Sequence, residues 1–300
     1  MPCSDARGAG SPDDVPTARR VPGLGPADTI EMGERWRWLD QELESPYLNV
    51  ALEEALFRVL ERRGGPPTVR VWRNPTAVVV GASQEVRAEV DVEACLRRRV
   101  PIIRRFTGGG TVYHDPGNLN YTFCVGRRDP HFAPDLRRNY EIVSQLLVEM
   151  LGELGLEASF RAPNGVYVRG RKVCGLAGRL GRQGLLLHGT LLVASDLEVL
   201  RELLELYGRH PADQRRARGV RSRKEEVTNL AAELGRPVGT ADLAALLEQA
   251  VPKHFGVTLV PERLGQEERE LAERLLREKY ATVSWIFHAR PPSAGDPGWA

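Results

Sequence analysis

Cysteine is scarce in this sequence, and the few cysteines present form no recognisable site. The four cysteines, at positions 3, 95, 124 and 174, are widely separated, and no Cys-x-x-Cys pair occurs in the 300 residues. This spacing excludes the usual zinc sites and gives no sign of a disulfide framework. We therefore expect reduced thiols and a cytoplasmic protein.

Long apolar runs and an excess of one charge are absent too. No segment reaches the ~18 apolar residues of a membrane-spanning helix, and the first residues lack the apolar core of a signal peptide. The 42 Lys and Arg residues are balanced by 40 Asp and Glu residues, so the chain has no overall attraction to nucleic acid. No helix-turn-helix pattern precedes residue 36. We expect no nucleic-acid partner and no membrane partner.

Large apolar residues are nearly missing from residues 1–33, where Gly, Pro, Ser and Asp dominate. A segment of this composition cannot bury enough apolar surface to offset the entropy that ordering costs. Residues 289–300 are rich in Pro and Gly as well. We therefore predict disordered tails at both ends and one folded domain over residues 34–288.

Within that domain, strand-like and helical patterns alternate. Apolar runs bounded by turn residues predict strands at 36–39, 68–72, 77–80, 100–103, 111–113, 119–125, 166–168, 172 onward and 184–193. Helical spacing and capping residues predict helices after Ser45 and Pro46, over 91–99, over 143–154, from a capping box at Ser195 to 204, from Thr240, and over 266–280. The apolar residues 283–287 either close the core or form a docking edge.

The most informative stretch covers residues 103–115. An apolar strand ends in Arg104 and Arg105, three glycines follow at 108–110, and a second strand comes next. Amide N–H groups of glycines beside fixed guanidinium groups suit phosphate or carboxylate oxygens. The pattern is not a phosphate loop, because no Lys-Ser/Thr follows, and not a dinucleotide fingerprint, because no helix follows. The alternative is a hairpin turn with two solvated arginines.

A longer string that includes this stretch resembles a known family. Residues 104–123 read RRFTGGGTVYHDPGNLNYTF, which is similar to the signature of the lipoate–protein ligase A family within the biotin/lipoate ligase superfamily. Similar segments follow in the family's order: RKVCGLA at 171–177, HGTLL at 188–192, and VRSR with VTNL over 220–230, lengthened here by residues 224–226. The resemblance covers residues 36–288. It implies an α+β fold with mixed, largely antiparallel β-sheets flanked by helices, as in a biotin/lipoate ligase-like catalytic domain.

The resemblance also implies a reaction and a site. Such ligases use ATP and Mg²⁺ to convert lipoate or octanoate to acyl-AMP and then acylate a lysine of a lipoyl carrier domain. The residue implied to be catalytic is Lys172. Those implied to bind ATP and lipoyl-AMP are Arg105, Gly108, Gly109, Gly110, Thr111, Val112, Tyr113 and Lys172. Those implied to support the site are His114, Asn164, His188, Gly189 and Thr190.

Three further expectations concern the surroundings of this site. Gln84 belongs to a segment similar to the family's Gly-x-x-Gln, which lies near the ligand. The apolar lipoyl tail requires an apolar tunnel, for which we expect residues such as Val79, Val112, Tyr113 and Leu187. The metal ligands are unknown, because many relatives have an aspartate after the asparagine that corresponds to Asn164, and this chain has Gly165 there. Judged from the residues alone, Lys172 is an ordinary hairpin lysine and His188 a core histidine.

A second reaction remains open on the same fold. Octanoyl or lipoyl transferases move the acyl group from a carrier protein through a cysteine thioester, and their cysteine precedes the Asn164 region. In this chain Ser159 stands near that place, and serine without an adjacent base is a poor nucleophile. Cys174 lies two residues after Lys172 and keeps a thiol mechanism possible, although a buried core cysteine is the simpler interpretation.

The resemblance implies partners as well. The acceptors would be lipoyl domains of 2-oxoacid dehydrogenases or the glycine cleavage H protein. Many full-length lipoate ligases carry a small C-terminal accessory domain, and the residues after Phe287 are too few to fold as that domain. A separate small accessory subunit is therefore a further expected partner, one that would assist adenylation more than transfer.

Overall fold

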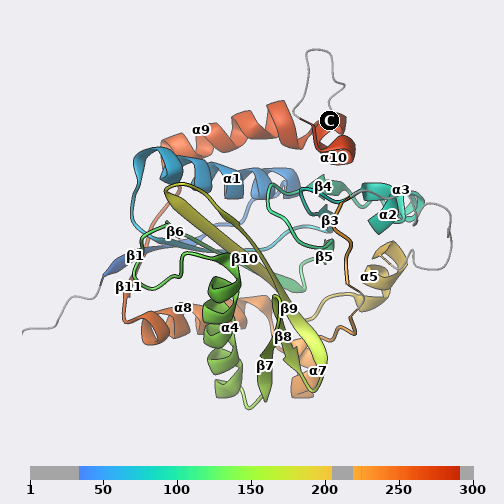
Figure 1. The fold of residues 1–300 in the computed structure, drawn as a ribbon. Coiled ribbons are helices and arrows are strands. Elements are labelled where there is room, and N and C mark those ends of the chain that lie inside the picture. Colours follow the sequence, from blue (N-terminus) through green and yellow to red (C-terminus); the bar gives the residue numbers. More distant parts are fainter. Residues whose placement is uncertain (1–33, 205–218, 224, 291–300) are drawn as a thin grey trace, which may run out of the picture. The chain divides into compact units, whose positions relative to one another are not determined.

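We describe the fold from a computed structural model of the chain, which describes residues 34–204, 219–223 and 225–290 (Figure 1). The predicted tails are 1–33 and 289–300, and all of their residues except Ala289 and Arg290 lie outside the described part, so the tails stay predictions. The amides of Ala289 and Arg290 donate to carbonyls of α10 (Val283–His288). The described residues belong to one compact unit. Within the described part of that unit, no helix is both long and apolar enough to cross a membrane.

The main element is a mixed sheet of eight strands. Its order is β11 (Thr258–Pro261), β1 (Arg35–Asp40), β2 (Thr68–Trp72), β6 (Asn118–Gly126), β10 (Gly184–Leu192), β9 (Arg171–Leu180), β8 (Gly165–Val168) and β7 (Ala158–Arg161). Strand β1 runs parallel to β11 and β2, and the other neighbours are antiparallel. The predicted fold class, α+β with largely antiparallel sheets, is confirmed.

Helices cover both faces of this sheet (Figure 1). Helices α4 (Leu136–Glu153) and α8 (Thr240–Phe255) pack on one face, and α1 (Pro46–Arg63) with α9 (Gln266–Leu275) covers the other. Because side chains alternate along a strand, Leu119, Tyr121 and Phe123 of β6 join the apolar core under α4 and α8. The intervening Asn120 and Thr122 face the other way, where the candidate site lies.

A small second sheet carries the glycine motif. Its order is β4 (Ile102–Arg104), β3 (Ala77–Val80) and β5 (Val112–His114), with β3 parallel to β4 and antiparallel to β5. The strands on either side of the glycines therefore flank β3 and do not pair with each other. The alternative of a plain hairpin turn is wrong, because the loop from Arg105 to Thr111 crosses the end of β3.

Capping explains the predicted boundaries of two helices. Ser45 Oγ accepts a hydrogen bond from the Leu48 amide at 3.3 Å, Pro46 is the first residue of α1, and Gly64 ends the helix with φ +68°. Asp91 caps α3 (Val92–Arg98) in the same way. Both predictions are confirmed. They succeed because a side-chain cap satisfies backbone amides that a helix leaves free at its start.

Four helix boundaries differ from the prediction. Helix α4 begins at Leu136, before the predicted start at 143, and is capped by Asp135, whose carboxylate accepts from the Arg138 amide. Helix α5 (Leu197–Leu204) is capped by Asp196, whose carboxylate accepts from two backbone amides, so the predicted cap at Ser195 is wrong. Helix α8 has Gly239 as its cap, and Thr240 is its first residue, with a hydroxyl that accepts from Arg73. The last helix changes after α9 into a π-helical turn, η1 (Leu276–Tyr280).

Among the described residues, five short elements were not predicted. They are α2 (Val86–Glu89), β7, α7 (Leu230–Leu234), β11 and α10. Strand β7 occupies much of the loop expected before Asn164, and its residues are only half-buried or exposed at the sheet edge. Its weak apolar pattern explains why the sequence did not reveal it.

The C-terminal apolar residues close the core. Helix α10 (Val283–His288) buries Ile286 to 2% exposure, and Trp285 and Phe287 pack against buried clusters. The buried Arg104 donates to the carbonyls of Trp285 and Ile286, and the Trp285 indole donates to the Arg104 carbonyl at 2.8 Å. These contacts support core closure for residues 283–287 and leave little of them to form a docking edge.

Candidate active site

The loop between β4 and β5 is held in shape by Arg105. Its buried guanidinium donates to the carbonyls of Gly108 at 2.6 Å and Gly110 at 2.8 Å, and to the Thr107 hydroxyl at 3.1 Å. Burial lowers the pKa of Arg105 to about 10, so the side chain is still cationic at neutral pH. Arg105 therefore orders the loop from behind and places a fixed positive charge beneath it.

Glycine is required at particular points of this loop. Gly109 has φ +90°, a conformation that side chains with a Cβ rarely adopt. Gly110 has no positive φ, but a Cβ there would lie 3.1 Å from the Ser222 hydroxyl. At Gly81 a Cβ would lie 2.2 Å from the carbonyl oxygen of Gly109, so the turn after β3 approaches the loop closely. A side chain at any of these three positions would therefore strain the backbone or crowd a neighbouring protein atom.

Gln84 connects that turn to the far side of the loop. Its carbonyl oxygen accepts from the Gly81 amide at 2.8 Å and from the Thr111 hydroxyl at 2.9 Å. Its amide donates to the Ser222 hydroxyl, which also accepts from the Thr111 amide at 2.9 Å. The structure therefore places Gln84 and Ser222 directly against the glycine motif.

A buried charged network supports the loop from the large sheet. Glu53 of α1 forms an ion pair with Arg70 of β2 at 3.0 Å, and both side chains are almost fully buried. The same carboxylate contacts His188 Nδ1 at 2.9 Å, and His188 Nε2 contacts the Thr107 hydroxyl at 2.8 Å. Burial alone would raise the pKa of Glu53, but the His188 hydrogen bond and the Arg70 charge outweigh it and lower the pKa. His188 is thus a link between a buried carboxylate and the loop.

A second network fixes His114 and Thr190. The two ring nitrogens of His114 contact the Asn74 amide at 3.0 Å and the Thr190 hydroxyl at 3.1 Å, and that hydroxyl donates to Asn120 at 2.8 Å. Burial, with the nearby Arg105 and His188, lowers the pKa of His114 to about 3. His114 is therefore neutral at physiological pH and acts as an oriented polar group.

Lys172 lies at the start of β9 with its backbone fixed on one side by the segment 226–228. The Lys172 amide donates to the Glu226 carbonyl at 2.7 Å, and the Thr228 amide donates to the Lys172 carbonyl at 3.0 Å. Its ammonium lies 2.5 Å from a carboxylate oxygen of Glu225 and 5.9 Å from the centre of the Tyr167 ring. The residue that the family resemblance implies to be catalytic is thus held by a carboxylate that the sequence did not single out.

Two adjoining cavities meet at Lys172. The first, of about 330 Å³, is lined by the glycine loop, by apolar residues such as Val79 and Val112, and by His188. The second, of about 440 Å³, is lined by Tyr113, Leu192 and Leu200 among others. The residues common to both linings are Thr111, Val112, Lys172, Gly175, Thr190, Ser222, Arg223 and Glu225.

Nearly all of the predicted site residues come together around these cavities. The first cavity is lined by Arg105, Gly109, Gly110, Thr111, Val112, His114, Asn164, Lys172, His188, Gly189 and Thr190. Tyr113 lines the second cavity only. Gly108 lines neither, and its carbonyl is bound by Arg105. Leu187, expected along the lipoyl tunnel, is instead fully buried in the core under α4 and α8.

Some site residues were missed. Asn49 and Glu53 lie within the apolar stripe of α1, one helical turn apart, and a polar pair on a buried helix face was the available signal. Glu225 lies in the stretch that lengthens the family-like segment. Nothing in the sequence showed that this stretch would reach Lys172.

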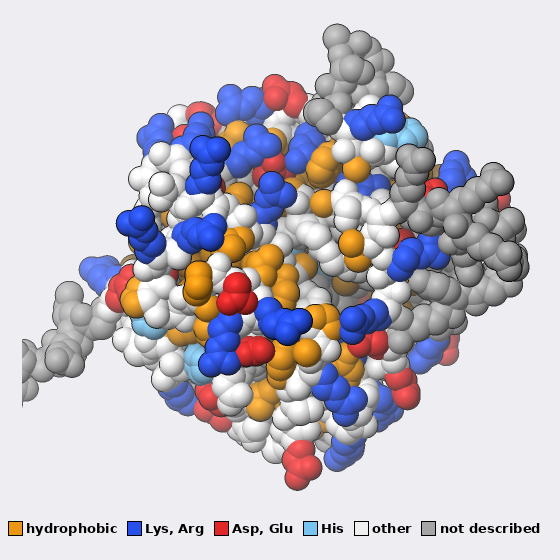
Figure 2. All heavy atoms as spheres, viewed as in Figure 1, with side chains coloured by type: hydrophobic (Ala, Val, Ile, Leu, Met, Phe, Trp, Pro, Cys, Tyr) orange, Lys and Arg blue, Asp and Glu red, His pale blue; other side chains and the backbone are white. Residues whose placement is uncertain are grey.

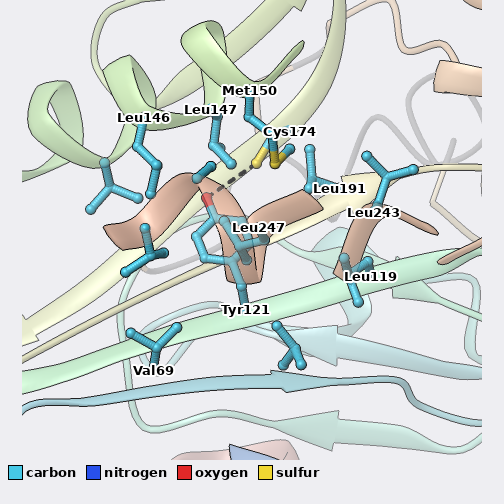
Figure 3. Close-up of a cluster of buried hydrophobic side chains, with 14 of the residues drawn as sticks. Val69, Leu119, Tyr121, Leu146, Leu147, Met150, Cys174, Leu191, Leu243 and Leu247 are labelled. Atoms are coloured by element: carbon cyan, nitrogen blue, oxygen red, sulfur yellow. Dashed lines mark hydrogen bonds between the residues drawn. The ribbon is translucent and has the colours of Figure 1, made fainter. Parts of the chain in front are cut away.

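The two candidate nucleophiles of an acyl-enzyme mechanism, Cys174 and Ser159, are poorly placed to meet a substrate in the cavities. Cys174 is buried, and Figure 3 shows its sulfur directed at Tyr121 among Leu147, Met150 and Leu191. The Tyr121 hydroxyl lies 3.4 Å from this sulfur, and burial raises the pKa of the thiol to about 11. Ser159 is exposed on the edge strand β7 and lines neither cavity. A reactive cysteine needs the opposite, a lowered pKa and access to substrate.

Carboxylates that could meet a metal are found in the second cavity. Glu89, Glu225 and Glu226 line it, but Glu225 is already bound by Lys172 and Tyr167, which leaves Glu89 and Glu226. Mg²⁺ in nucleotide sites uses one or two carboxylates together with phosphate oxygens. Within the part of the chain that the structure describes, the one compact His/Asp/Glu group consists of Glu34, Asp129 and His131, and it lines neither cavity.

Comparison with known proteins agrees with this fold. A family model described as the lipoyl protein ligase A/B catalytic domain matches residues 45–252. Octanoyltransferase LipM of Geobacillus kaustophilus is 30% identical over 278 residues, which cover 85% of this chain and 98% of that protein. Lipoate–protein ligase 1 of Staphylococcus aureus is 28% identical over 253 residues, covering 84% and 73%.

A solved structure shows the same fold. The bi-partite lipoate protein ligase of Thermoplasma acidophilum, studied with its E2 lipoyl domain, superposes with a TM-score of 0.73 at 24% identity and covers 87% of this chain and 99% of its own. The family model and the relatives together define an enzyme of the lipoate ligase and octanoyltransferase class. The chain belongs to the lipoyl protein ligase A/B catalytic-domain family, and the family resemblance seen in the sequence is confirmed.

Proposed function

We propose that this chain is a lipoate–protein ligase, which activates lipoate or octanoate with ATP and transfers the acyl group to a lysine of a lipoyl domain. The main support for this proposal is that the described site has a lysine at the junction of two cavities and no accessible thiol. Cys174 is the only described cysteine that lines either cavity, and its thiol is buried with a raised pKa. A thioester route would need a thiolate that this environment disfavours.

The two cavities suit the two parts of an acyl-adenylate. The first has apolar walls, including Val50, Trp72 and Val79, that fit the lipoyl tail. The second continues past Thr111 to Tyr113 and has room for the nucleotide. Lys172 lies between them, where the acyl carbonyl and the α-phosphate of such a ligand would meet.

In the first step a carboxylate oxygen of the acid attacks the α-phosphorus of ATP. The bond from that phosphorus to the bridging oxygen breaks, and pyrophosphate leaves. The reaction gathers negative oxygens, so fixed positive charge lowers its barrier. Lys172 supplies a cation at the junction, and Arg105 supplies a charge beneath the loop. Mg²⁺, when bound with ATP, would neutralise phosphate charge, and Glu89 and Glu226, which line the second cavity, would be the carboxylates to hold it.

In the second step the neutral amine of the acceptor lysine attacks the carbonyl carbon of the acyl-adenylate. A C–N bond forms, the C–O bond to phosphate breaks, AMP leaves, and the amine gives up a proton. Lys172 can hydrogen-bond the carbonyl oxygen and the phosphate as charge develops on both. The chain needs no covalent acyl-enzyme for this route.

Mass spectrometry of the product tests the proposal. The pure chain is incubated with an apo lipoyl domain and either lipoate plus ATP or octanoyl carrier protein. We expect the lipoyl mass increase with lipoate and ATP and no acylation from the carrier protein. Acylation from octanoyl carrier protein without ATP would contradict the ligase proposal.

One observation favours the second candidate, an octanoyltransferase. Several similar proteins carry that name, including the relative from Geobacillus kaustophilus. A transferase needs a nucleophile, and the described alternatives are Cys174 and Ser159. A thioester trapped on Cys174 would establish this candidate, so the trapping experiment separates the two.

The proposed acceptors are lipoyl domains of 2-oxoacid dehydrogenases or the glycine cleavage H protein. A lipoyl domain was studied with the Thermoplasma relative, which supports this choice of partner. On the face shown in Figure 2, Lys and Arg side chains lie beside Asp and Glu side chains, with hydrophobic atoms exposed between them, so a docking partner would meet both signs of charge. A separate small subunit stays a prediction. Comparing transfer from preformed lipoyl-adenylate with ligation from lipoate and ATP tests it.

A further inference from the structure

Glu225 is bound at both of its carboxylate oxygens by groups of the site. One oxygen lies 2.5 Å from the Lys172 ammonium, and the other accepts a hydrogen bond from the Tyr167 hydroxyl. The three residues come from β9, from β8 and from the segment 219–227, of which residue 224 is not described. Because Glu225 also lines both cavities, its carboxylate lies where the two cavities join.

The backbone on the Lys172 side of this contact is fixed. Residues 226–228 run beside Lys172 and exchange two hydrogen bonds with it, the longer of which is 3.0 Å. Glu225 directly precedes these residues, so it has little freedom to withdraw from Lys172. The backbone pairing of Lys172 with residues 226–228 therefore places the Glu225 carboxylate beside the Lys172 ammonium.

The ring of Tyr167 occupies space that is open because residue 165 is glycine. A Cβ on Gly165 would lie 2.5 Å from Cε2 of the Tyr167 ring and 2.9 Å from its hydroxyl oxygen. The Arg161 guanidinium lies 4.8 Å from the ring centre and adds a cation–π contact. Gly165 thus leaves room for the ring, and the ring holds Glu225.

The charge state of Glu225 supports an ion pair at neutral pH. Burial alone would raise its pKa, but the hydrogen bonds from Lys172 and Tyr167 outweigh burial and lower the pKa. A lysine ammonium has three N–H donors on a flexible four-carbon stem. One donor directed at Glu225 leaves two, which is the number needed for an acyl carbonyl and a phosphate oxygen.

We propose that Glu225 is a positioning residue, which holds the Lys172 ammonium at the junction of the two cavities, and that Tyr167 acts through Glu225. This inference rests on the proposed function, because it takes Lys172 as the group that meets the acyl-adenylate. A carboxylate near the phosphate also repels it, so Glu225 slightly weakens ground-state binding while it orients Lys172. Its removal should therefore lower kcat without raising KM for ATP.

The test measures single-turnover transfer from synthetic lipoyl-adenylate to an apo lipoyl domain, and steady-state ligation with varied ATP. Glu225→Gln should slow both reactions about 10- to 100-fold and leave KM for ATP unchanged or lower. Glu225→Asp retains the charge and should transfer at least about threefold faster than Glu225→Gln. Glu157→Gln, the same change at an exposed position outside both cavities, is the matched control and should behave as wild type.

A double variant examines the route through Tyr167. Tyr167→Phe retains the ring above Gly165 and removes the hydroxyl, and it should slow transfer about three- to tenfold. In the Glu225→Gln background the same change should cost nothing further, because its only proposed effect is on Glu225. Thermal denaturation of each variant shows whether the fold is retained.

Two results would overturn the inference: a Glu225→Gln variant within about twofold of wild type, or a Tyr167→Phe loss of equal size in both backgrounds. Transfer from lipoyl-adenylate uses no ATP. A chain that cannot adenylate lipoate would therefore contradict the proposed function, but the transfer rates of the variants could still be compared.

Discussion

Among single residues, Lys172 is the one on which the ligase proposal depends most. Lys172→Ala removes the cation at the junction of the cavities, so we expect acyl transfer to fall by at least about 100-fold, equivalent to ~2.7 kcal/mol of barrier. The fold should persist, because the strand pairing of Lys172 uses backbone groups. Single-turnover transfer and near-ultraviolet circular dichroism measure the two effects. Turnover within about tenfold of wild type would show that Lys172 is not catalytic.

Cys174 gives the complementary residue-scale prediction. Its sulfur makes weak polar contacts with the Tyr121 hydroxyl, the Gly175 carbonyl and the Thr190 backbone, so Cys174→Ser should retain activity within about threefold. Placing a hydroxyl among apolar side chains should cost about 1 kcal/mol of unfolding free energy. Activity per folded molecule and urea denaturation check these values. Complete loss of activity in well-folded protein would instead favour the thioester route.

Some site residues could be predicted from the sequence and others could not. The glycines, Lys172 and His188 were found through long motifs, since each motif holds several unusual residues at fixed spacing. The contacts of Glu225 depend on how the stretch from 224 to 226 returns to β9, which is a long-range pairing without a local pattern. Arg105 was expected to face a ligand, and the structure adds that its guanidinium also donates to the loop carbonyls of Gly108 and Gly110 and to the Val79 carbonyl of β3.

At the scale of elements, the loop between β4 and β5 is the feature that positions ligand. Gly109→Val places a β-branched side chain at φ +90°, and its Cβ would lie 3.0 Å from the Arg105 guanidinium. We expect a strain of about 1–3 kcal/mol and at least about tenfold weaker binding of lipoyl-adenylate, measured by calorimetry.

Gly126→Val is the matched control for this substitution. Gly126 ends β6 and has no positive φ, and a Cβ at this position would meet no neighbouring atom within 4 Å. This variant should bind lipoyl-adenylate as wild type does. Undiminished binding by Gly109→Val as well would show that the loop conformation does not matter for the ligand.

Element prediction succeeded where local chemistry decides the outcome. The cap at Ser45, the stop at Gly64 and the strands over 68–72 and 77–80 were all found in the sequence and are confirmed. Short edge strands such as β7 and β11 have four residues each and incomplete burial. Their existence depends on a neighbouring strand that offers hydrogen bonds, which no local pattern reveals.

At the scale of the whole molecule, the buried pair of Glu53 and Arg70 joins α1 to the large sheet. The pKa of Glu53 is lowered in the folded state, so its carboxylate stabilises the fold above its unfolded pKa of about 4.3. That contribution is lost as pH falls through the lower, folded-state pKa. Acid should therefore weaken the wild-type fold progressively below about pH 5.

Glu53→Gln tests this linkage. The variant leaves Arg70 buried without its counter-ion, which should cost about 3–5 kcal/mol at neutral pH. Its unfolding free energy should also fall less steeply between pH 5 and pH 3, because the variant lacks the carboxyl group whose pKa is lowered in the folded state. Urea denaturation at several pH values compares the two slopes. Parallel curves for variant and wild type would contradict the linkage.

The identity of the reaction is the central claim at this scale, and lipoate-dependent ATP–pyrophosphate exchange tests it most directly. The pure chain is incubated with ATP, Mg²⁺, labelled pyrophosphate and lipoate, without acceptor domain. If the chain forms lipoyl-AMP, label should enter ATP only when lipoate is present, and Lys172→Ala should abolish the signal. Absence of exchange from a wild-type chain that acylates a lipoyl domain from octanoyl carrier protein would contradict the ligase account.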